Sequence, residues 1–188
     1  MNKVSIIALL TCSMTIPTAL AEISILTPSN SGKVNFSGFI LTNSCRVEIN
    51  DKDKHVRLPP QKTSVLSDTI VQSITPFTIS VKDCPSYGHW VPKLVWEPDF
   101  SLLTRNGYLK NRSYNGAENV ALVILHGKEK INLKDRKRFS SDRRNSDFHD
   151  GQKYHFEVGY IIARDSNDKR GVTPGPVTAQ ASYRITYL

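Results

Sequence analysis

Residues of the types that act as catalysts or hold metal ions are present in this protein, but their spacing fits neither role. The histidines are His55, His89, His126, His149 and His155. None of them forms an H-x-x-x-H pair or an H-E-x-x-H motif. A metal ion could draw together His149, His155, Asp147 and Asp150, but a polar loop that enters a strand explains these residues more simply. No serine lies in a G-x-S-x-G turn, and there is no glycine-rich phosphate loop. We therefore expect no enzymatic activity, no metal and no cofactor.

The first 21 residues are typical of a secretory leader. Lys3 supplies a positive charge, Val4–Leu10 is apolar apart from Ser5, and Ala19-Leu20-Ala21 is a small-x-small cleavage pattern. The alternative, an N-terminal membrane anchor, is disfavoured because the apolar run is shorter than the roughly 20 residues that a spanning helix needs. We expect a signal peptide over residues 1–21, export from the cytoplasm and no stable membrane insertion.

Cleavage of the leader would leave two cysteines. Cys12 would leave with the leader, and Cys45 and Cys84 would remain. Two thiols in an exported protein usually pair, because the destination is oxidising. Two buried free thiols are the alternative; a zinc site is disfavoured because neither cysteine has a second ligand at metal spacing. The sequence thus favours a Cys45–Cys84 disulfide.

The protein has a formal net charge of +8, and its basic residues gather in Lys128–Arg144. Such a segment could bind nucleic acid or an anionic surface. Its only aromatic residue is Phe139, so it lacks the interleaved stacking residues of a nucleic-acid groove. A solvated loop or hairpin is the favoured interpretation, and no nucleic-acid partner is expected. Contact with an acidic polysaccharide or a neighbouring subunit remains open.

Strands, rather than helices, are predicted along most of the sequence. Several segments alternate apolar and polar residues with a period of two, which is typical of half-buried strands, and one segment is apolar on both faces, as a buried strand would be. The expected strands lie at the start of Lys33–Asn50 and in Pro76–Lys82, Val91–Trp96, Asn119–His126, Tyr154–Ile162 and Val177–Tyr187. Turn-forming clusters separate them, so we expect one all-β domain, a β-sandwich.

The segment that follows the leader differs from the rest. Glu22–Gly32 ends in a turn-like run of Thr, Pro, Ser, Asn and Gly and is typical of a flexible arm. Beyond it, Val34, Phe36, Gly38 and Ile40 place alternate residues on one side of an extended segment. By itself this alternation is equally consistent with an ordinary first strand of a complete sandwich.

Several motifs, in the same order, resemble those of chaperone–usher fimbrial subunits, the type 1 and P pilus family. Gly32–Gly38, followed by Cys45, matches the N-terminal pattern G-x-V-x-F-x-G and its cysteine, and Pro76–Cys84 matches the strand that leads into the second cysteine. Asn119–Ile124 matches the N-V-G-V-x-I strand, and Gly175 with Ala179–Leu188 matches the C-terminal pattern with its penultimate tyrosine. Two positions depart from the family. Arg57-Leu58-Pro59-Pro60-Gln61 replaces the usual L-G-Q, and Ala121 replaces a common glycine.

The resemblance implies an incomplete immunoglobulin-like β-sandwich that lacks its last strand and carries an N-terminal donor-strand extension. The expected parts are the extension, residues 22–38, and the pilin domain, residues 39–188. In the family a periplasmic chaperone fills the groove left by the missing strand, and at an outer-membrane usher the extension of the next subunit replaces it. The implied donor residues are Val34, Phe36, Gly38 and Ile40. The implied groove residues are Gly175, Val177, Ala179, Ala181, Tyr183, Ile185, Tyr187 and Leu188, whose carboxylate the chaperone would hold.

The resemblance further implies passage through the periplasm and assembly with neighbouring pilin subunits, as a homo- or hetero-polymer, into an adhesive fimbria at the bacterial cell surface. The sequence leaves open whether the protein is a rod subunit, an adaptor or a terminator, which would have a blocked groove. The alternative class is a secreted, self-complete β-sandwich that binds glycan or another anionic ligand directly. The sheet edge beside Val177–Tyr187 distinguishes the two classes.

Overall fold

The computed structural model describes residues 34–37, 45–84, 91–142, 151–163 and 170–187. The protein divides into two units, Met1–Phe39 and Ile40–Leu188. Of the first unit, only residues 34–37 are described, and they form no regular secondary structure. Within the described residues, no helix is long and apolar enough to cross a membrane.

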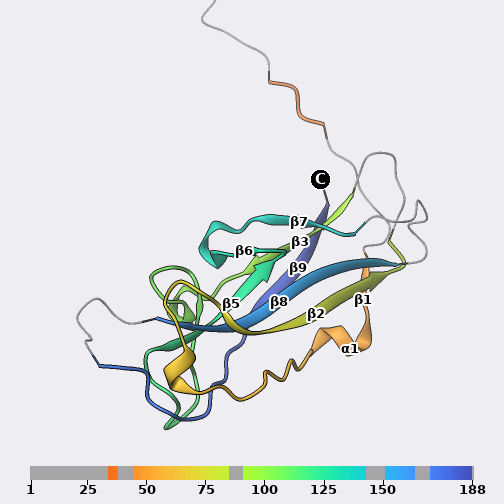
Figure 1. Ribbon diagram of the computed structural model, residues 1–188. Coiled ribbons are helices and arrows are strands. Elements are labelled where there is room, and N and C mark those ends of the chain that lie inside the picture. The colour runs from red at the N-terminus through yellow and green to blue at the C-terminus, as the bar shows by residue number, and fades with distance from the viewer. Residues whose placement is uncertain (1–33, 38–44, 85–90, 143–150, 164–169, 188) are drawn as a thin grey trace, which may run out of the picture. The chain divides into compact units, whose positions relative to one another are not determined.

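The larger of two antiparallel sheets contains most of the strands of the second unit (Figure 1). Its strands, in spatial order, are β1 (Arg46–Val47), β2 (Gln72–Lys82), β8 (Gln152–Ile162), β5 (Val120–His126) and β4 (Leu109–Lys110), and β6 (Glu129–Lys130) also pairs with β5. The two longest strands, β2 and β8, lie side by side, with Phe77 opposite Phe156. The short strand β1 pairs with β2 at one end of the sheet.

The smaller sheet has three strands in the order β7 (Arg138–Ser140), β3 (Pro92–Glu97) and β9 (Ser182–Tyr187). Strand β9 pairs with β3 along its whole length, from Ser182 opposite Glu97 to Tyr187 opposite Pro92. In the described part of the protein no strand pairs with the other edge of β9. The last strand is therefore an edge strand.

Helices are few and short. One turn of α-helix, α1 (Ile49–Lys52), follows β1. Three 3-10 helices cover Thr63–Val65, Phe100–Leu102 and Leu133–Asp135. The prediction of an all-β sandwich is confirmed.

Aromatic side chains from both sheets form the centre of the core. Phe156 of β8 meets Trp96 of β3 and Phe139 of β7, each with ring centroids 5.2 Å apart, in edge-to-face arrangements. Such rings bury large apolar areas and so hold the two sheets together. Strand β5 is buried on both faces: Leu122 and Ile124 face this core, while alternate residues of β5 join a second cluster on the opposite face, which includes Ala121 and Ile161.

Most of the predicted strands are observed within one to a few residues. At the start of Lys33–Asn50, however, residues 34–37 form no regular secondary structure, and residues 38–44 lie outside the described residues. The C-terminal strand also differs from the prediction. The sequence predicts one strand over Val177–Tyr187, but β9 begins only at Ser182. Upstream, the backbone bonds to the loop around Asn111–Ala117 instead. The N–H of Arg112 donates to the carbonyl of Thr178 (2.8 Å), and the N–H of Ala117 donates to the carbonyl of Pro176 (3.1 Å). These bonds replace strand pairing in this segment.

Candidate functional site

An open groove of about 990 Å³ separates the beginning of the second unit from its last strand. One wall is formed by residues 45–58 and the other by residues 178–183. The floor is apolar and belongs to the core; it consists of Phe77, Ile79, Trp96, Leu109, Leu122, Ile124 and Val158. The indole N–H of Trp96 is buried and has no hydrogen-bond partner among the described residues. The groove thus exposes the core along a line where a further strand would lie.

The pairing of β3 with β9 determines which backbone groups of β9 face outward. Tyr187 lies opposite Pro92. Because proline has no N–H, this pair cannot be a hydrogen-bonded pair of the ladder. Hydrogen-bonded and non-hydrogen-bonded pairs alternate, so Tyr183, Ile185 and Tyr187 direct their N–H and carbonyl groups away from β3. The free edge of β9 therefore presents a row of backbone donors and acceptors.

The opposite wall also carries backbone groups that face the groove. The N–H of Glu48 donates to the carbonyl of Ser80 in β2 at 2.9 Å. Successive N–H groups of an extended segment point to opposite sides, so those of Cys45 and Val47 point away from β2. Further along this wall, no backbone–backbone hydrogen bond joins His55–Gln61 to another described residue. A strand in the groove could pair with both walls.

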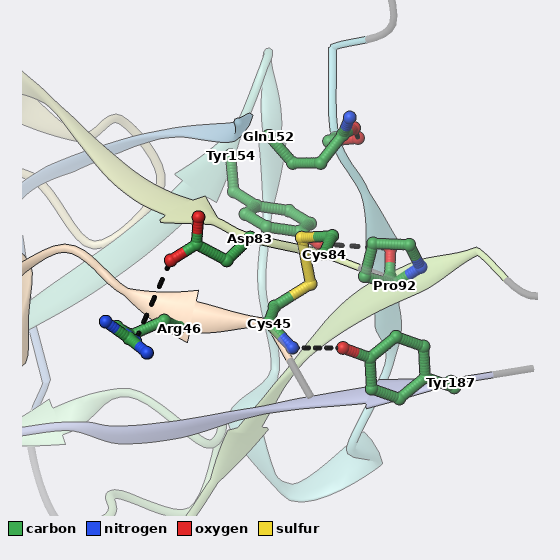
Figure 2. Close-up of a disulfide and its surroundings, with 9 residues drawn as sticks. Cys45, Arg46, Asp83, Cys84, Pro92, Gln152, Tyr154 and Tyr187 are labelled. Atoms are coloured by element: carbon green, nitrogen blue, oxygen red, sulfur yellow. Dashed lines mark hydrogen bonds and ion pairs between the residues drawn. A yellow bond between two sulfur atoms is a disulfide. The ribbon is translucent and has the colours of Figure 1, made fainter. Parts of the chain in front are cut away.

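Two tyrosines of β9 reach the opposite wall. The hydroxyl of Tyr183 donates to the backbone carbonyl of Asp51 at 2.6 Å. The hydroxyl of Tyr187 accepts from the N–H of Cys45, as Figure 2 shows. Burial, and then the nearby charge of Asp51, raise the pKa of the Tyr183 hydroxyl, so it remains a neutral donor at physiological pH.

A disulfide holds the wall that begins at Cys45. Cys45 and Cys84 are bridged, with Cα atoms 4.1 Å apart, and Cys84 follows the end of β2 (Figure 2). The predicted disulfide is present. Beside it, the hydroxyl of Tyr154 in β8 donates to the carbonyl of Pro92 at 3.0 Å and so ties the larger sheet to β3.

A second hollow, of about 550 Å³, also has Leu58 in its wall. Its lining also includes Gly175, Val177, Pro60 and Tyr160. A Cβ atom on Gly175 would lie 2.6 Å from the backbone nitrogen of Ala117, closer than atoms can pack. A glycine at this position lets the backbone pass the loop before β9.

The predicted groove residues lie at different places along these two hollows. Ala179, Ala181 and Tyr183 line the groove, whereas Gly175 and Val177 line the second hollow. Ile185 and Tyr187 are partly buried against the core and lie beyond the groove lining. Leu188 lies outside the described residues.

The predicted donor residues are described only in part. Val34 and Phe36 are 74% and 92% exposed, and they are the large apolar side chains of residues 34–37. Gly38 and Ile40 lie outside the described residues. The exposure of two large apolar side chains on a segment without regular structure is unusual for a segment that folds into its own domain.

Sequence reasoning missed most of the wall opposite β9. Asp51 is 4% exposed, although it lies in a polar cluster whose composition predicts a turn. His55, Val56 and Leu58 line the groove without any strand alternation in the sequence. No local signal marks these residues, because only the register of distant strands brings them to the groove.

The described part of the basic segment is largely bound to its own domain. Lys137 pairs with Glu129 at 2.8 Å, and the ammonium groups of Lys130 and Lys134 donate to the backbone carbonyls of Thr69 and Arg105. These contacts favour a structural role for this segment. Among the described residues, no group of His, Cys, Asp and Glu side chains is placed to hold a metal ion.

Known proteins resemble this protein in sequence and in fold. The family model described as "Fimbrial protein" matches residues 34–188. The chain belongs to the fimbrial protein family. This fimbrial subunit is 30% identical over 110 residues to the F17 fimbrial protein of Escherichia coli, a match that covers 56% of the subunit and 61% of that relative's length.

Solved pilus structures share the fold of this fimbrial subunit. The P pilus rod subunit PapA superposes with a TM-score of 0.54 at 18% identity, covering 83% of the subunit and all of PapA (100%). The subunit structure of a chaperone–usher pilus, solved to explain rod uncoiling, gives a TM-score of 0.56 at 18% identity and covers 86% of the subunit and 98% of that protein. The protein, a member of the fimbrial protein family, thus has a pilin-type β-sandwich fold.

Proposed function

We propose that this fimbrial subunit is an internal structural subunit of an adhesive pilus and that it polymerises by strand donation. The observation that carries the proposal is the open apolar groove beside the free edge of β9. An unpaired strand edge next to exposed core is prone to aggregation, so such a surface requires a partner. Addition of a strand to an exposed sheet edge is a known mode of recognition, and donor-strand complementation of pilins is one of its established examples.

The N-terminal arm supplies a suitable strand. Val34 and Phe36 are exposed apolar residues separated by one polar residue, Asn35, so in an extended conformation both point to the same side. The groove floor between its two walls is apolar and could receive such alternate side chains. We infer that residues 22–38 form the donor extension, residues 39–188 form the acceptor domain, and the acceptor is a neighbouring pilin subunit.

The subunit would first take a strand from a periplasmic chaperone and exchange it at an outer-membrane usher for the arm of the next subunit. This route places it in the periplasm after removal of residues 1–21, and then in a fimbria at the cell surface, where it supports adhesion. A terminator would have a blocked groove, whereas here none of the described residues fills the groove. This feature favours a rod or adaptor subunit over a terminator, and it disfavours a self-complete sandwich that binds glycan directly.

The proposal is tested with the whole protein and its own chaperone and usher. Polymers should form with the complete mature protein and be absent when it is trimmed through Ser37, while the trimmed protein still co-purifies with the chaperone. Phe36→Ala should weaken polymerisation, whereas Asn35→Ala, which changes the neighbouring residue on the opposite side of the arm, should not. Polymers of the trimmed protein at the normal level would contradict strand donation.

A further inference from the structure

The hydrogen bond of Tyr183 crosses the groove that an incoming strand would enter, and the hydrogen bond of Tyr187, which lies beyond the groove lining, joins the same strand β9 to Cys45 at the end of the opposite wall. The Tyr183 hydroxyl donates to the carbonyl of Asp51 (2.6 Å), and the Tyr187 hydroxyl accepts from the N–H of Cys45. We propose that these two tyrosines are positioning residues that join the groove walls in the unfilled subunit, and that their hydroxyls release the opposite wall when a strand is taken up. The inference rests on the proposed function, because it assigns a step to uptake of the donor strand.

The contact of Tyr187 occupies a hydrogen-bonding position that a strand would use. The N–H of Cys45 points away from β2, as the Glu48–Ser80 hydrogen bond shows, and therefore lies on the open edge of the larger sheet. A strand that paired with this edge would place a carbonyl oxygen where the Tyr187 hydroxyl now lies. One N–H has a single proton to donate, so the hydroxyl and the strand compete for it.

The contact of Tyr183 acts on the same wall, further along the sequence, at Asp51. Asp51 belongs to α1, and its carbonyl accepts the Tyr183 hydroxyl across the groove. The Tyr183 ring also packs edge-to-face on Trp96, with centroids 6.0 Å apart, so the ring can remain in the core after the hydroxyl has been released. The hydroxyl bond can therefore be removed by mutation while the packing of the ring is kept.

Strand β9 and the segment that precedes it differ in how they meet the opposite wall. Ala179 and Ala181 have side chains too short to span the groove, and there the groove is open. At Tyr183 and Tyr187 the walls are joined. A strand would therefore meet an open section beside the two alanines and joined walls further along. Uptake of the complete strand requires both hydroxyl bonds to break.

The test uses the mature protein with its disulfide intact, folded at nanomolar concentration so that self-assembly is slow. A fluorescein-labelled peptide of residues 30–42 is added in micromolar excess, and anisotropy gives the rate of uptake. Tyr183→Phe and Tyr187→Phe remove the hydroxyls and keep the rings. Each should accelerate uptake about fivefold, the factor expected for one net hydrogen bond, and the double variant should accelerate it further.

Tyr154→Phe is the matched control. It also removes a tyrosine hydroxyl that donates to a backbone carbonyl, that of Pro92, the residue opposite Tyr187, but this bond joins β8 to β3 and does not connect the two groove walls. Its uptake rate should equal that of the wild type. Acceleration by Tyr154→Phe as large as by the groove variants would show general loosening of the domain and would overturn the inference, as would unchanged or slower uptake by the groove variants.

A measurement on the wild-type protein does not depend on whether the variants fold. An NMR nuclear Overhauser contact between the Cys45 amide proton and the Tyr187 ring should be present in the empty subunit and lost after peptide uptake. Persistence of that contact in the filled subunit would overturn the inference while leaving strand donation intact. Failure of the wild-type protein to take up the peptide at all would instead contradict the proposed function.

Discussion

The side-chain carboxylate of Asp51 accepts a hydrogen bond from the backbone N–H of Ser80 at 2.6 Å, and this bond fixes α1 to β2. Asp51 is almost completely buried, and its other carboxylate oxygen accepts a hydrogen bond from the ammonium group of Lys54. Its backbone carbonyl accepts Tyr183 from the opposite wall of the groove. A single aspartate thus connects the helical turn of one wall to the larger sheet and, through its backbone, to the last strand.

Asp51→Ala should lower the free energy of unfolding by about 2–3 kcal/mol. The substitution leaves the part-buried N–H of Ser80 without its acceptor and removes one of the two acceptors of the Lys54 ammonium, which also donates to the carbonyl of Thr78. A hydrogen bond to a charged group contributes about 1.5–3 kcal/mol, more than a bond between neutral groups. Urea unfolding of the oxidised protein measures the change. Asp53→Ala is the control, since this side chain is 94% exposed and should contribute less than about 0.5 kcal/mol. Equal effects of the two substitutions would show that the Asp51 bonds have no special weight.

Cys84→Ser should lower the stability of the domain by about 4 kcal/mol. The disulfide closes a segment with a sequence separation of 39 residues, and such a cross-link reduces the conformational entropy of the unfolded protein. Reduction of the wild-type protein with dithiothreitol should produce a similar loss. Both are measured as shifts of the urea midpoint; a midpoint that moves in neither case would contradict the structural role of the bridge.

The stability of the domain should fall as the pH rises above about 10, the ordinary pKa of tyrosine. Burial, followed by the proximity of Tyr187, raises the pKa of Tyr154, and burial raises the pKa values of Tyr160 and Tyr183. Above pH 10 the unfolded protein therefore releases these protons before the folded protein does, which favours unfolding. Urea midpoints between pH 8 and pH 11 measure this slope.

Tyr154→Phe should make that alkaline slope less steep, because it removes one of the groups with a raised pKa. At neutral pH it should cost about 1 kcal/mol, the net value of the hydrogen bond to Pro92. Tyr114→Phe is the control, since Tyr114 is 91% exposed. An alkaline slope that does not change in Tyr154→Phe would show that this hydroxyl is not a source of the pH dependence.

Gly175→Ala should destabilise the domain by about 1–3 kcal/mol, the usual cost of overpacking. The new Cβ would lie 2.6 Å from the backbone nitrogen of Ala117 and 2.8 Å from the carbonyl carbon of Gly116, and both are backbone atoms that cannot rotate away. Gly171→Ala is a matched control in the same segment, because a Cβ there meets nothing within 4 Å. Thermal unfolding of the two variants provides the comparison, and equal melting temperatures would contradict the close approach.

The sequence predicted the regular strands well, because their side chains alternate between core and solvent. The apolar residues of β2 and β8 carry this pattern in their own order along the sequence, and β5 is apolar on both faces because both of its faces are buried. The sequence could not show that β9 starts late, because Val177–Ala181 continues the alternation of apolar and polar residues. The strand starts late because the carbonyls of Thr178 and Pro176 accept hydrogen bonds from Arg112 and Ala117, which are far away in sequence.

The groove was predicted on one side only. Ala179, Ala181 and Tyr183 carry the family pattern and line the groove. The facing wall at Asp51–Leu58 has no pattern of its own, because it is irregular and its position depends on the disulfide at Cys45 and on the Asp51–Ser80 bond. A site that forms between an irregular segment and a distant strand requires the tertiary structure.

The central claim, that the arm of one subunit fills the groove of another, is tested most directly by disulfide cross-linking in assembled polymers. Subunits with Phe36→Cys are mixed with subunits with Ala181→Cys, assembled with chaperone and usher, and examined by non-reducing electrophoresis and peptide mass spectrometry. Ser37→Cys, one residue further along the arm, replaces Phe36→Cys in the control. The account predicts a disulfide between positions 36 and 181 of different subunits and little linkage from position 37. Polymers in which positions 36 and 181 do not link, or link only within one subunit, would contradict it.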